Sequence, residues 1–407
     1  MTYSKPEIKI NQSTSYIKQL LHLGLKGAEQ QNWSLVLHQL RLLPLISLTE
    51  NDWQTSFKLA LAVLLGGDFQ EQWEVAKIFP LLGTKIIEPL IILLEDNSTE
   101  TAIKWFICQI LGNFSEPEVI IALIELLQQP DPELVSIASQ TLTRIGSAAI
   151  DALVELLPHP EYRLLAVKSL ACIRRSEIVT PLLSIVNDPQ AEIRTIVIEA
   201  LGSFHAQAIP PILIAALRDT ASSVRREAAI ALGFRRDLCI ELDLVTHLQP
   251  LLYDLNLEVC RQTAIALSRM KETSAVQALF EVLQSPHTPL ELQFDLVRAL
   301  GWSEVELAID YLGQTLAIAP ESIVREIIAV LGRISSPQLK ERATNILLNF
   351  CNSPRSRFNS PQTKQTFALS LGELGSSAAK PHLLTLAADE NQIVRLHAIA
   401  ALKKLSL

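Results

Sequence analysis

The chain has 407 residues, of which 49% are hydrophobic and only 5% aromatic, and its formal net charge is −8. An aliphatic composition of this kind favours helices and excludes collagen-like, disordered and disulfide-scaffold proteins. The negative charge argues against nucleic acid as a partner, and the apolar stretches are far shorter than the roughly 20 residues of an integral membrane segment.

The first predicted elements in chain order are a polar tail and a helical segment. Residues 1–14 are polar and predicted to be disordered. Residues 15–69 are predicted to form an N-terminal helical cap, in which two similar helix–turn–helix joints, at Asn32-Trp33 and Asp68-Phe69, lie 36 residues apart. This spacing loosely resembles a pair of tetratricopeptide repeats, so a separate partner-binding module is the alternative to a plain cap.

A sequence motif that recurs about every 31 residues extends through residues 70–407. It consists of an acidic turn, then Val or Ile followed by Arg, and then a helix that ends in Ala-Leu-Gly. The best copies are residues 188–202 and 219–233. Alignment on the final position, called the glycine slot below, gives eleven units, with the slot at Pro80, Gly112, Thr143, Ala171, Gly202, Gly233, Ser268, Gly301, Gly332, Gly372 and Lys403.

Each unit is predicted to contain two helices, the first apolar at helical spacing and the second with Arg or Lys on its polar side. Prolines support this interpretation, because Pro181 and Pro211 stand where a helix begins, whereas Pro189 and Pro320 stand between paired helices. A helix pair this short cannot bury its apolar face alone, so consecutive pairs must stack. The predicted fold class is therefore all-α, a right-handed α-solenoid with an N-terminal helical cap.

The recurring Asp…Val-Arg…Ala-Leu-Gly pattern resembles the HEAT-like repeats of the phycobilisome-lyase type, which are common in cyanobacteria. The resemblance covers about four-fifths of the chain. It implies a HEAT-like solenoid, a link to phycobilisomes and photosynthesis, and, as an activity, bilin transfer. The units at Ala171, Ser268 and Lys403 lack the glycine, which indicates degeneration of the repeat.

Basic residues recur eight positions before the glycine slot, and aspartates recur fourteen before it. A residue type that repeats at a structural period usually serves the stack. We therefore predict a structural ladder in which each arginine reaches the acidic turn or the carbonyls of a neighbouring unit, with a ligand-binding basic groove as the alternative. The predicted ladder residues are Asp188, Arg194, Asp219, Arg225, Asp389 and Arg395, and Lys104, Arg163, Lys364 and Asp254 share the two positions.

Other arginines lie off this position, in the middle units. They are predicted partner-binding residues, although a solvated face of mixed charge is the simpler interpretation. These residues are Arg174, Arg175, Arg226, Arg235 and Arg236.

The 40-residue interval between Gly332 and Gly372 carries about nine extra residues, within residues 351–361. Insertions in solenoids map to loops and often form a binding edge. A tolerated surface insertion is the alternative. Within this stretch, the predicted partner contacts are Arg355, Arg357 and Phe358.

No catalytic, cofactor-binding or metal-binding residues are predicted. The sequence has no P-loop, G-x-S-x-G, H-E-x-x-H or C-x-x-C motif. HEAT-like hydroxylases hold iron with His-Glu pairs, and none of the eight histidines here precedes Glu. Cys172, Cys239 and Cys260 lie in or beside second helices and are expected in the core, with covalent bilin transfer as the alternative role.

The sequence therefore predicts a non-enzymatic scaffold, adaptor or assembly factor that binds one or more proteins on the concave surface of the solenoid. The chain has no leader-like start, so a cytoplasmic location is expected, and the resemblance adds a peripheral thylakoid one. The alternative that the resemblance implies is a bilin lyase or chromophore chaperone. A nucleic-acid-binding solenoid is a further alternative, which the net charge of −8 disfavours.

Overall fold

The structure is a computed structural model that describes residues 7–43, 48–353 and 360–405. Every regular element in these ranges is a helix, which confirms the all-α prediction. None of the described helices is long and apolar enough to cross a membrane. The chain divides into two compact units, Met1–Ile185 and Val186–Leu407, called unit 1 and unit 2.

Unit 1 contains eleven α-helices in its described residues. They are α1 (Glu7–Glu29), α2 (Trp33–Leu42), α3 (Glu50–Gly66), α4 (Phe69–Ala76), α5 (Ile87–Glu95), α6 (Thr101–Leu111), α7 (Pro117–Leu126), α8 (Pro132–Ile145), α9 (Ser147–Leu156), α10 (Pro160–Cys172) and α11 (Val179–Ser184).

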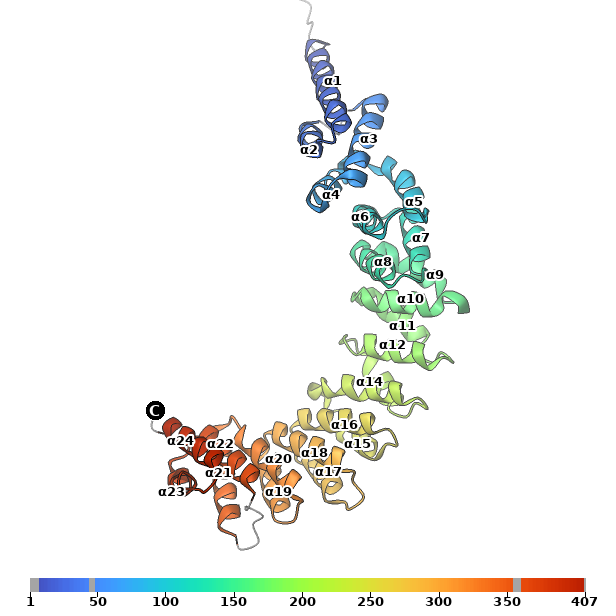
Figure 1. Cartoon of the computed structure of the whole chain (residues 1–407). Coiled ribbons are helices and arrows are strands. Elements are labelled where there is room, and N and C mark those ends of the chain that lie inside the picture. The colour runs from blue at the N-terminus through green and yellow to red at the C-terminus, as the bar shows by residue number, and fades with distance from the viewer. Residues whose placement is uncertain (1–6, 44–47, 354–359, 406–407) are drawn as a thin grey trace, which may run out of the picture. The chain divides into compact units, whose positions relative to one another are not determined.

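The helices of unit 1 stack in two rows. The even-numbered helices α2, α4, α6, α8 and α10 contact one another in succession, and the odd-numbered helices pack similarly from α5 through α7 to α9. Figure 1 shows these pairs following one another along unit 1. Because α1 packs on α3 and α2 packs on α4, the two-row pattern reaches into the segment 15–69 that was expected as a cap.

Helix α1 begins at Glu7, within the stretch 1–14 for which disorder was expected; residues 1–6 lie outside the described residues. The glycine slot at Pro80 falls just after α4, in the 3-10 helix η2 (Phe79–Leu82). Helix α4 therefore serves as the second helix of that repeat unit, and α3 serves as the first.

Unit 2 contains thirteen α-helices in its described residues. They are α12 (Ala191–Leu201), α13 (Ile209–Ala216), α14 (Ser222–Gly233), α15 (Leu244–Leu248), α16 (Leu257–Met270), α17 (Thr273–Gln284), α18 (Leu290–Ser303), α19 (Glu306–Leu316), α20 (Glu321–Gly332), α21 (Pro337–Asn352), α22 (Pro361–Leu374), α23 (Lys380–Leu386) and α24 (Gln392–Lys404).

Within unit 2, the even-numbered helices from α12 to α24 contact one another in an unbroken row. Figure 1 shows α16, α18, α20 and α22 side by side, with α17 and α19 in the second row. The core between the rows is aliphatic and fully buried, as at Leu201, Leu232 and Leu267, which directly precede glycine slots. This alternation of helices is the α-solenoid that the sequence predicted.

The glycine slot owes its residue preference to close packing of second helices. A Cβ atom at Gly202 would lie 2.7 Å from the Cβ of Ala231, and one at Gly233 would lie 2.9 Å from the Cβ of Ala266. Carbon atoms in contact prefer about 3.5–4.0 Å, so a side chain here would push α12 from α14, or α14 from α16. The recurring glycine therefore sets the close spacing of the stack.

The extra residues near the C-terminus lie only partly in a loop. Helix α21 has 16 residues, whereas α19, the first helix of the preceding pair, has 11, so five of the additional residues extend the helix. Cys351 and Asn352 consequently belong to α21.

Candidate functional site

The recurring arginines and aspartates join consecutive helix pairs in unit 2. Asp219 is held by its own turn, because its Oδ1 accepts the backbone N–H of Ala221 at 2.8 Å. Arg194, from the preceding pair, donates Nε and Nη2 to the two oxygens of Asp219 at 2.8 and 2.7 Å. Its Nη1 donates to the carbonyls of Asp188 and Pro189 in its own turn. One guanidinium thus binds two successive turns.

The same arrangement recurs one repeat unit later in the sequence. Arg225 donates Nε and Nη2 to Asp254 at 2.7 and 2.8 Å, and its Nη1 donates to the carbonyls of Asp219 and Thr220. These two guanidinium bridges are called rungs below. Both side-chain pairs are mostly buried, and a bidentate, charge-assisted contact of this kind gives both strength and fixed geometry.

Similar contacts occur at the C-terminal repeats. Lys364 donates Nζ to Asp389 at 2.6 Å, again across one repeat unit. Arg395 donates Nη1 to the carbonyls of Asp389 and Glu390 at 2.8 Å. The Arg194 guanidinium holds the pKa of Asp219 below its usual range, and the Arg225 guanidinium does the same to the pKa of Asp254. The charged side chains at these positions thus bind one another between adjacent repeat units of the stack.

Arg235 requires a correction, because it was expected on a partner-binding surface and is buried, with 7% of its area exposed. It donates Nε and Nη2 to the exposed Asp237 at 3.1 and 3.0 Å. Its buried Nη1 finds no hydrogen-bond partner among the described residues. The position two after the glycine slot holds a buried apolar residue in several other repeat units, as at Ile173, Met270 and Ile334. Arg235 therefore occupies a core position.

Arg175 and Arg236 are exposed, and each also donates a hydrogen bond to an adjacent repeat unit. Arg236 donates Nε to the carbonyl of Met270 at the end of α16, at 3.2 Å. Arg175 donates Nη1 to Ser147 Oγ at 3.3 Å. A cation at the C-terminal end of a helix is favoured by the helix dipole, so Arg236 also serves the stack.

Arg174 and Arg226 are the remaining off-slot arginines. Arg174 is exposed and has a left-handed backbone with φ of 43°. Arg226 is partly exposed and donates Nε and Nη2 to Glu227. Arg174 belongs to unit 1 and Arg226 to unit 2.

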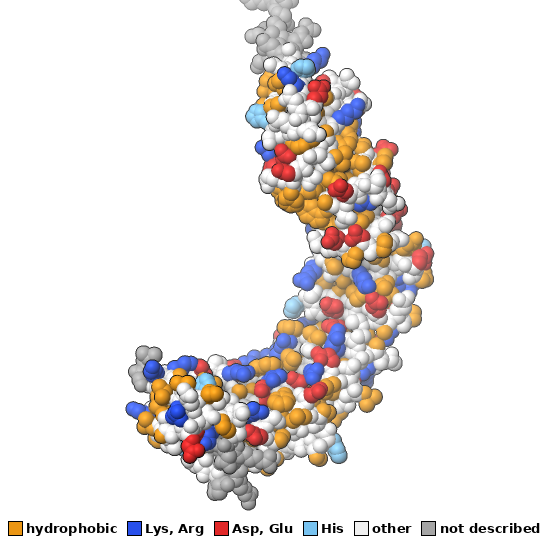
Figure 2. Space-filling view, viewed as in Figure 1, with side chains coloured by type: hydrophobic (Ala, Val, Ile, Leu, Met, Phe, Trp, Pro, Cys, Tyr) orange, Lys and Arg blue, Asp and Glu red, His pale blue; other side chains and the backbone are white. Residues whose placement is uncertain are grey.

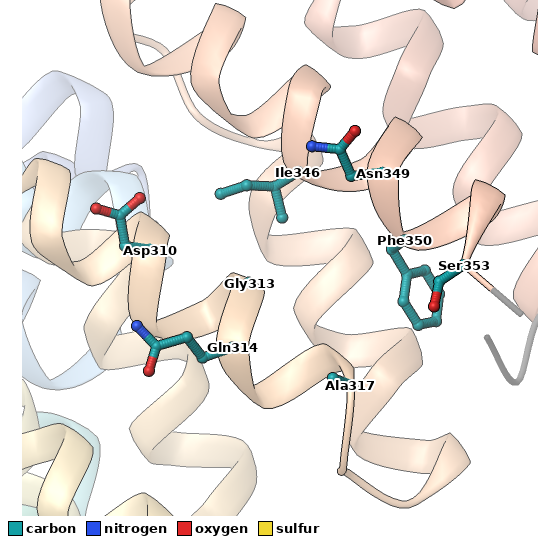
Figure 3. Close-up of a pocket in the computed structure, with 8 residues that line it drawn as sticks. All are labelled: Asp310, Gly313, Gln314, Ala317, Ile346, Asn349, Phe350 and Ser353. Carbon is teal, nitrogen blue, oxygen red and sulfur yellow. The ribbon is translucent and has the colours of Figure 1, made fainter. Parts of the chain in front are cut away.

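Arg355, Arg357 and Phe358 lie outside the described residues. Within the described residues, a pocket of about 520 Å³ opens between α19 and α21, and Ser353 is among the residues that line it. Figure 3 shows Asp310 and Gln314 of α19 on one side and Ile346 and Asn349 of α21 on the other. The Asp310 carboxylate already accepts two hydrogen bonds from Arg342 at 2.6 and 2.7 Å, so its charge is neutralised at the rim.

An exposed aromatic patch in unit 1 is the clearest candidate for a binding surface. Helix α4 begins with a capping box, in which the side chains of Asp68 and Glu71 accept each other's backbone N–H groups. This cap places Phe69 in the first turn and Trp73 four residues later on the same face. Their rings stack with centroids 6.4 Å apart, and they remain 66% and 40% exposed.

The patch continues onto α6. The Trp73 ring lies 6.1 Å from Trp105, and the Phe69 ring lies 5.5 Å from the buried Phe106. Leu65 at the end of α3 adds a half-exposed aliphatic side chain. Leu65, Phe69, Trp73 and Trp105 are called the aromatic patch below, and Figure 2 shows hydrophobic side chains gathered over α3 and α4.

A pocket of about 320 Å³ adjoins the patch. It is lined by Trp73, Lys77 and Pro80, by Gln109 of α6, and by Asn113, which follows α6. The Lys77 ammonium lies 5.8 Å from the Trp73 ring centroid, within cation–π range. Sequence reasoning singled out residues 65–73 only as a helix joint. The concentration of scarce aromatics within residues 69–106 was the available signal.

The cysteines do not form a reactive site in the described residues. Cys239 and Cys260 are buried as expected, but Cys172 is exposed, because it ends α10 on the outward side, and this corrects the expectation of a core position. Burial raises the pKa of Cys260 and raises that of Cys108 to about 12. The described residues also contain no group of three side chains that could hold a metal ion.

The fold defines an α-solenoid protein, and sequence comparison gives its repeat type. The family model for HEAT repeats matches residues 87–171 and 150–233, which contain α5 to α14. Residues 87–233, just over a third of the chain, thus resemble HEAT repeats in sequence. No curated protein matches the chain.

Solved structures support the same fold. A mutant of Kap121p aligns with 96% of this chain at 11% identity and a TM-score of 0.52, and importin beta aligns with 95% at 12% identity and 0.51. The chain covers 49% of the former and 65% of the latter, and at such identities the likeness concerns the fold alone. Human deoxyhypusine hydroxylase, in complex with glycerol, aligns with 67% of this chain and 99% of its own, at 22% identity and a TM-score of only 0.28.

Proposed function

We propose that the chain is a non-enzymatic scaffold that binds other proteins, with the aromatic patch as its principal contact surface. The single observation that supports this is the exposure of Phe69 and Trp73, 66% and 40%, in a stacked pair on a capped helix. Exposed aromatic patches mark protein interaction sites, and aromatic residues dominate binding energy at interface centres. The surrounding HEAT-like stack supplies the rigid support.

The pattern around the patch suits a protein partner. Lys77 and Arg41 both pair with Glu74, at 2.8 and 2.6 Å, so a satisfied polar rim borders the apolar centre. An apolar centre with a polar rim is the usual anatomy of a protein interface. In the adjoining pocket, Asn113 Nδ2 donates to the carbonyls of Gln109 and Ile110, and Gln109 Oε1 accepts from Arg144, so Asn113 Oδ1 and Gln109 Nε2 are the amide atoms proposed to bind backbone groups of the partner.

The test is capture of partners by variants that change only the patch. We expect the wild-type chain to retain partners from a native lysate that the double variant Phe69→Ser, Trp73→Ser loses, because both side chains would lie at the centre of the interface. The matched control is Ile240→Ser, which removes a side chain 83% exposed in unit 2. The control should melt at the wild-type temperature. The patch variant should melt cooperatively at a lower temperature, because Phe69 packs on Phe106 and Trp73 packs on Trp105, and capture is compared below both melting temperatures. Equal capture by the wild type and the patch variant would refute this surface.

A link to phycobilisomes or other photosynthetic complexes, and a place beside thylakoids, remain part of the proposal through the repeat resemblance alone. The bilin lyase or chromophore-chaperone alternative would need a reactive group or a cofactor pocket. Burial raises the pKa of the thiols of Cys108, Cys239, Cys260 and Cys351, which opposes thiolate chemistry at these four residues. Incubation with bilin and an absorbance spectrum tests this alternative.

The exposed arginines stay proposed secondary contacts. Arg174 and Arg175 belong to unit 1, whereas Arg226 and Arg236 belong to unit 2, so we treat them as two separate surfaces. Residues 354–361, which include Arg355, Arg357 and Phe358, are a proposed contact next to the pocket of Figure 3. Deletion of residues 354–359, which keeps the N-cap Ser360 and the first residue of α22, should weaken partner capture without lowering the melting temperature.

A further inference from the structure

The row of arginine rungs is interrupted in unit 2. Helix α16 carries Cys260 at the position that Arg194 and Arg225 hold in α12 and α14, six residues after the turn aspartate. The next turn has His287 where the two preceding turns carry the acceptors Asp219 and Asp254. Both partners of this rung are therefore replaced together.

A cavity lies where the missing rung would be. It has a volume of about 290 Å³ and is lined by the turn of Asp254 and Leu255, by Cys260, and by the following turn with Ser285 and His287. In the two preceding repeat units, the guanidinium groups of Arg194 and Arg225 bridge the corresponding pairs of turns. A water molecule takes about 30 Å³ of liquid, so the cavity has room for a side chain.

The carbonyl groups of the turn remain suited to a guanidinium. In the intact rungs, the carbonyls six and five residues before the arginine accept Nη1. Here the first, Asp254 O, accepts only the weak S–H donor of Cys260 at 3.2 Å. The second, Leu255 O, receives no hydrogen bond from the described residues. The cavity thus keeps two acceptors and lacks a strong donor.

The rim suits the remainder of an arginine side chain. Tyr253 is 62% exposed and the Leu255 side chain is fully exposed, so both can cover the methylene groups of an entering side chain. Arginine fits this site better than lysine, because its planar fork can bind both turns at once, as Arg225 does. The buried Cys260 thiol is too short to reach the second turn.

We propose that this cavity binds an arginine side chain of a partner protein, whose guanidinium takes the place of the missing rung between α16 and the turn before α18. This inference rests on the proposed scaffold function and names a chemical feature of the partner. It uses a site in unit 2, whereas the aromatic patch lies in unit 1, so the two can be tested separately.

The test uses N-acetyl-arginine amide as the probe and saturation-transfer NMR on the full chain. We expect transfer to the arginine probe, and at least a fivefold weaker signal with the neutral isostere N-acetyl-citrulline amide. The variant Cys260→Arg fills the cavity with the chain's own guanidinium and should abolish transfer. Equal signals from the two probes, or undiminished transfer in a cooperatively melting Cys260→Arg variant, would overturn the proposal.

If the Cys260→Arg variant does not fold, a second variant tests the arginine-binding proposal. His287→Asp changes an exposed residue and restores the carboxylate that Asp219 and Asp254 supply elsewhere. It should tighten binding of the arginine probe by about fivefold, the gain from a partly exposed ion pair. No gain in affinity contradicts the proposal. Neither result depends on partner capture through the aromatic patch, so failure of one proposal is distinguishable from failure of the other.

Discussion

Arg225 binds Asp254 through two parallel hydrogen bonds of 2.7 and 2.8 Å, and it binds the turn of Asp219 with its remaining nitrogen. Arg225 therefore joins two consecutive helix pairs, and Arg194, which holds Asp219, extends the connection to a third. In a repeat array, stability is a sum of unit and nearest-neighbour terms. The rungs contribute to the interaction between neighbouring repeat units. The loss of one rung should therefore destabilise mainly the repeats that it joins.

The first prediction concerns Arg225→Ala. The substitution leaves Asp254 with only the backbone N–H of Asn256, so we expect a local loss of about 1.5–3 kcal/mol, the range for hydrogen bonds to charged groups. Hydrogen exchange measured by mass spectrometry should show reduced protection in α14 and α16 and unchanged protection in α20 to α24. A uniform loss along unit 2 would show that the rung acts globally.

The second prediction concerns pH. Asp219 and Asp254 have pKa values lowered below the ordinary 3.8 by hydrogen bonds from Arg194 and Arg225. A lowered carboxyl pKa stabilises the fold fully above the unfolded value and ceases to do so as the pH falls through the folded value. The melting temperature should therefore decline below about pH 4.

The matched variant for this pH effect is Asp219→Asn, Asp254→Asn. It lacks both titrating groups, so its melting temperature should start lower at neutral pH and fall less between about pH 4 and pH 2.5. Parallel curves for the variant and the wild type would show that other carboxylates cause the acid sensitivity.

The third prediction concerns Arg235→Met. Nη1 of Arg235 is buried without a partner among the described residues, and Met270 occupies the equivalent position of the next unit. Replacing a buried ion by a well-packed apolar residue is often neutral or stabilising by about 1–4 kcal/mol. The melting temperature should stay equal or rise.

Charge reversal distinguishes the two adjacent arginines. Arg235→Glu would bury a carboxylate beside Asp237 and should lower the melting temperature, whereas the exposed Arg236→Glu should lower it much less. A drop for Arg235→Met as large as that for Arg235→Glu would mean that the guanidinium stabilises this core position.

The repeat explains how much of this could be predicted from the sequence. A fixed period places equivalent residues in register, so the all-α stack followed from spacing alone, and Arg194 and Asp219, 25 residues apart, could be paired before any coordinates. Arg235 could not be placed in the same way, because a charged residue suggests exposure. Its apolar equivalents Ile173 and Met270 were the better indication.

The aromatic patch was harder to predict for a different reason. Phe69 and Trp73 are four residues apart on one helix face, which is the pattern of a buried stripe as much as of an exposed one. Only packing decides between the two, and here Trp105 and Phe106 of α6 meet one side of the pair and leave the other side open. Periodicity identifies the face but not the partner that covers it.

The fourth prediction concerns the left-handed position three residues after the glycine slot. Positive φ occurs there at six positions, between 43° and 79°: Gly83, Gly146, Arg174, Lys271, Glu304 and Gly375. A left-handed conformation costs a residue with a Cβ roughly 1–2 kcal/mol, whereas glycine adopts it freely. Six repeat units thus share this turn geometry, but only three of them have glycine at the left-handed position.

Opposite substitutions at two of these positions test this account. A Cβ at Gly375 would meet no atom within 4 Å, so Gly375→Ala measures backbone strain alone and should destabilise the last repeats by about 1 kcal/mol. Arg174→Gly should stabilise α10 and α11 by a similar amount, because Arg174 pays that strain in the wild type. Hydrogen exchange around each turn measures both. Changes of the same sign would contradict a shared left-handed cap and would indicate that the Arg174 side chain itself stabilises its turn.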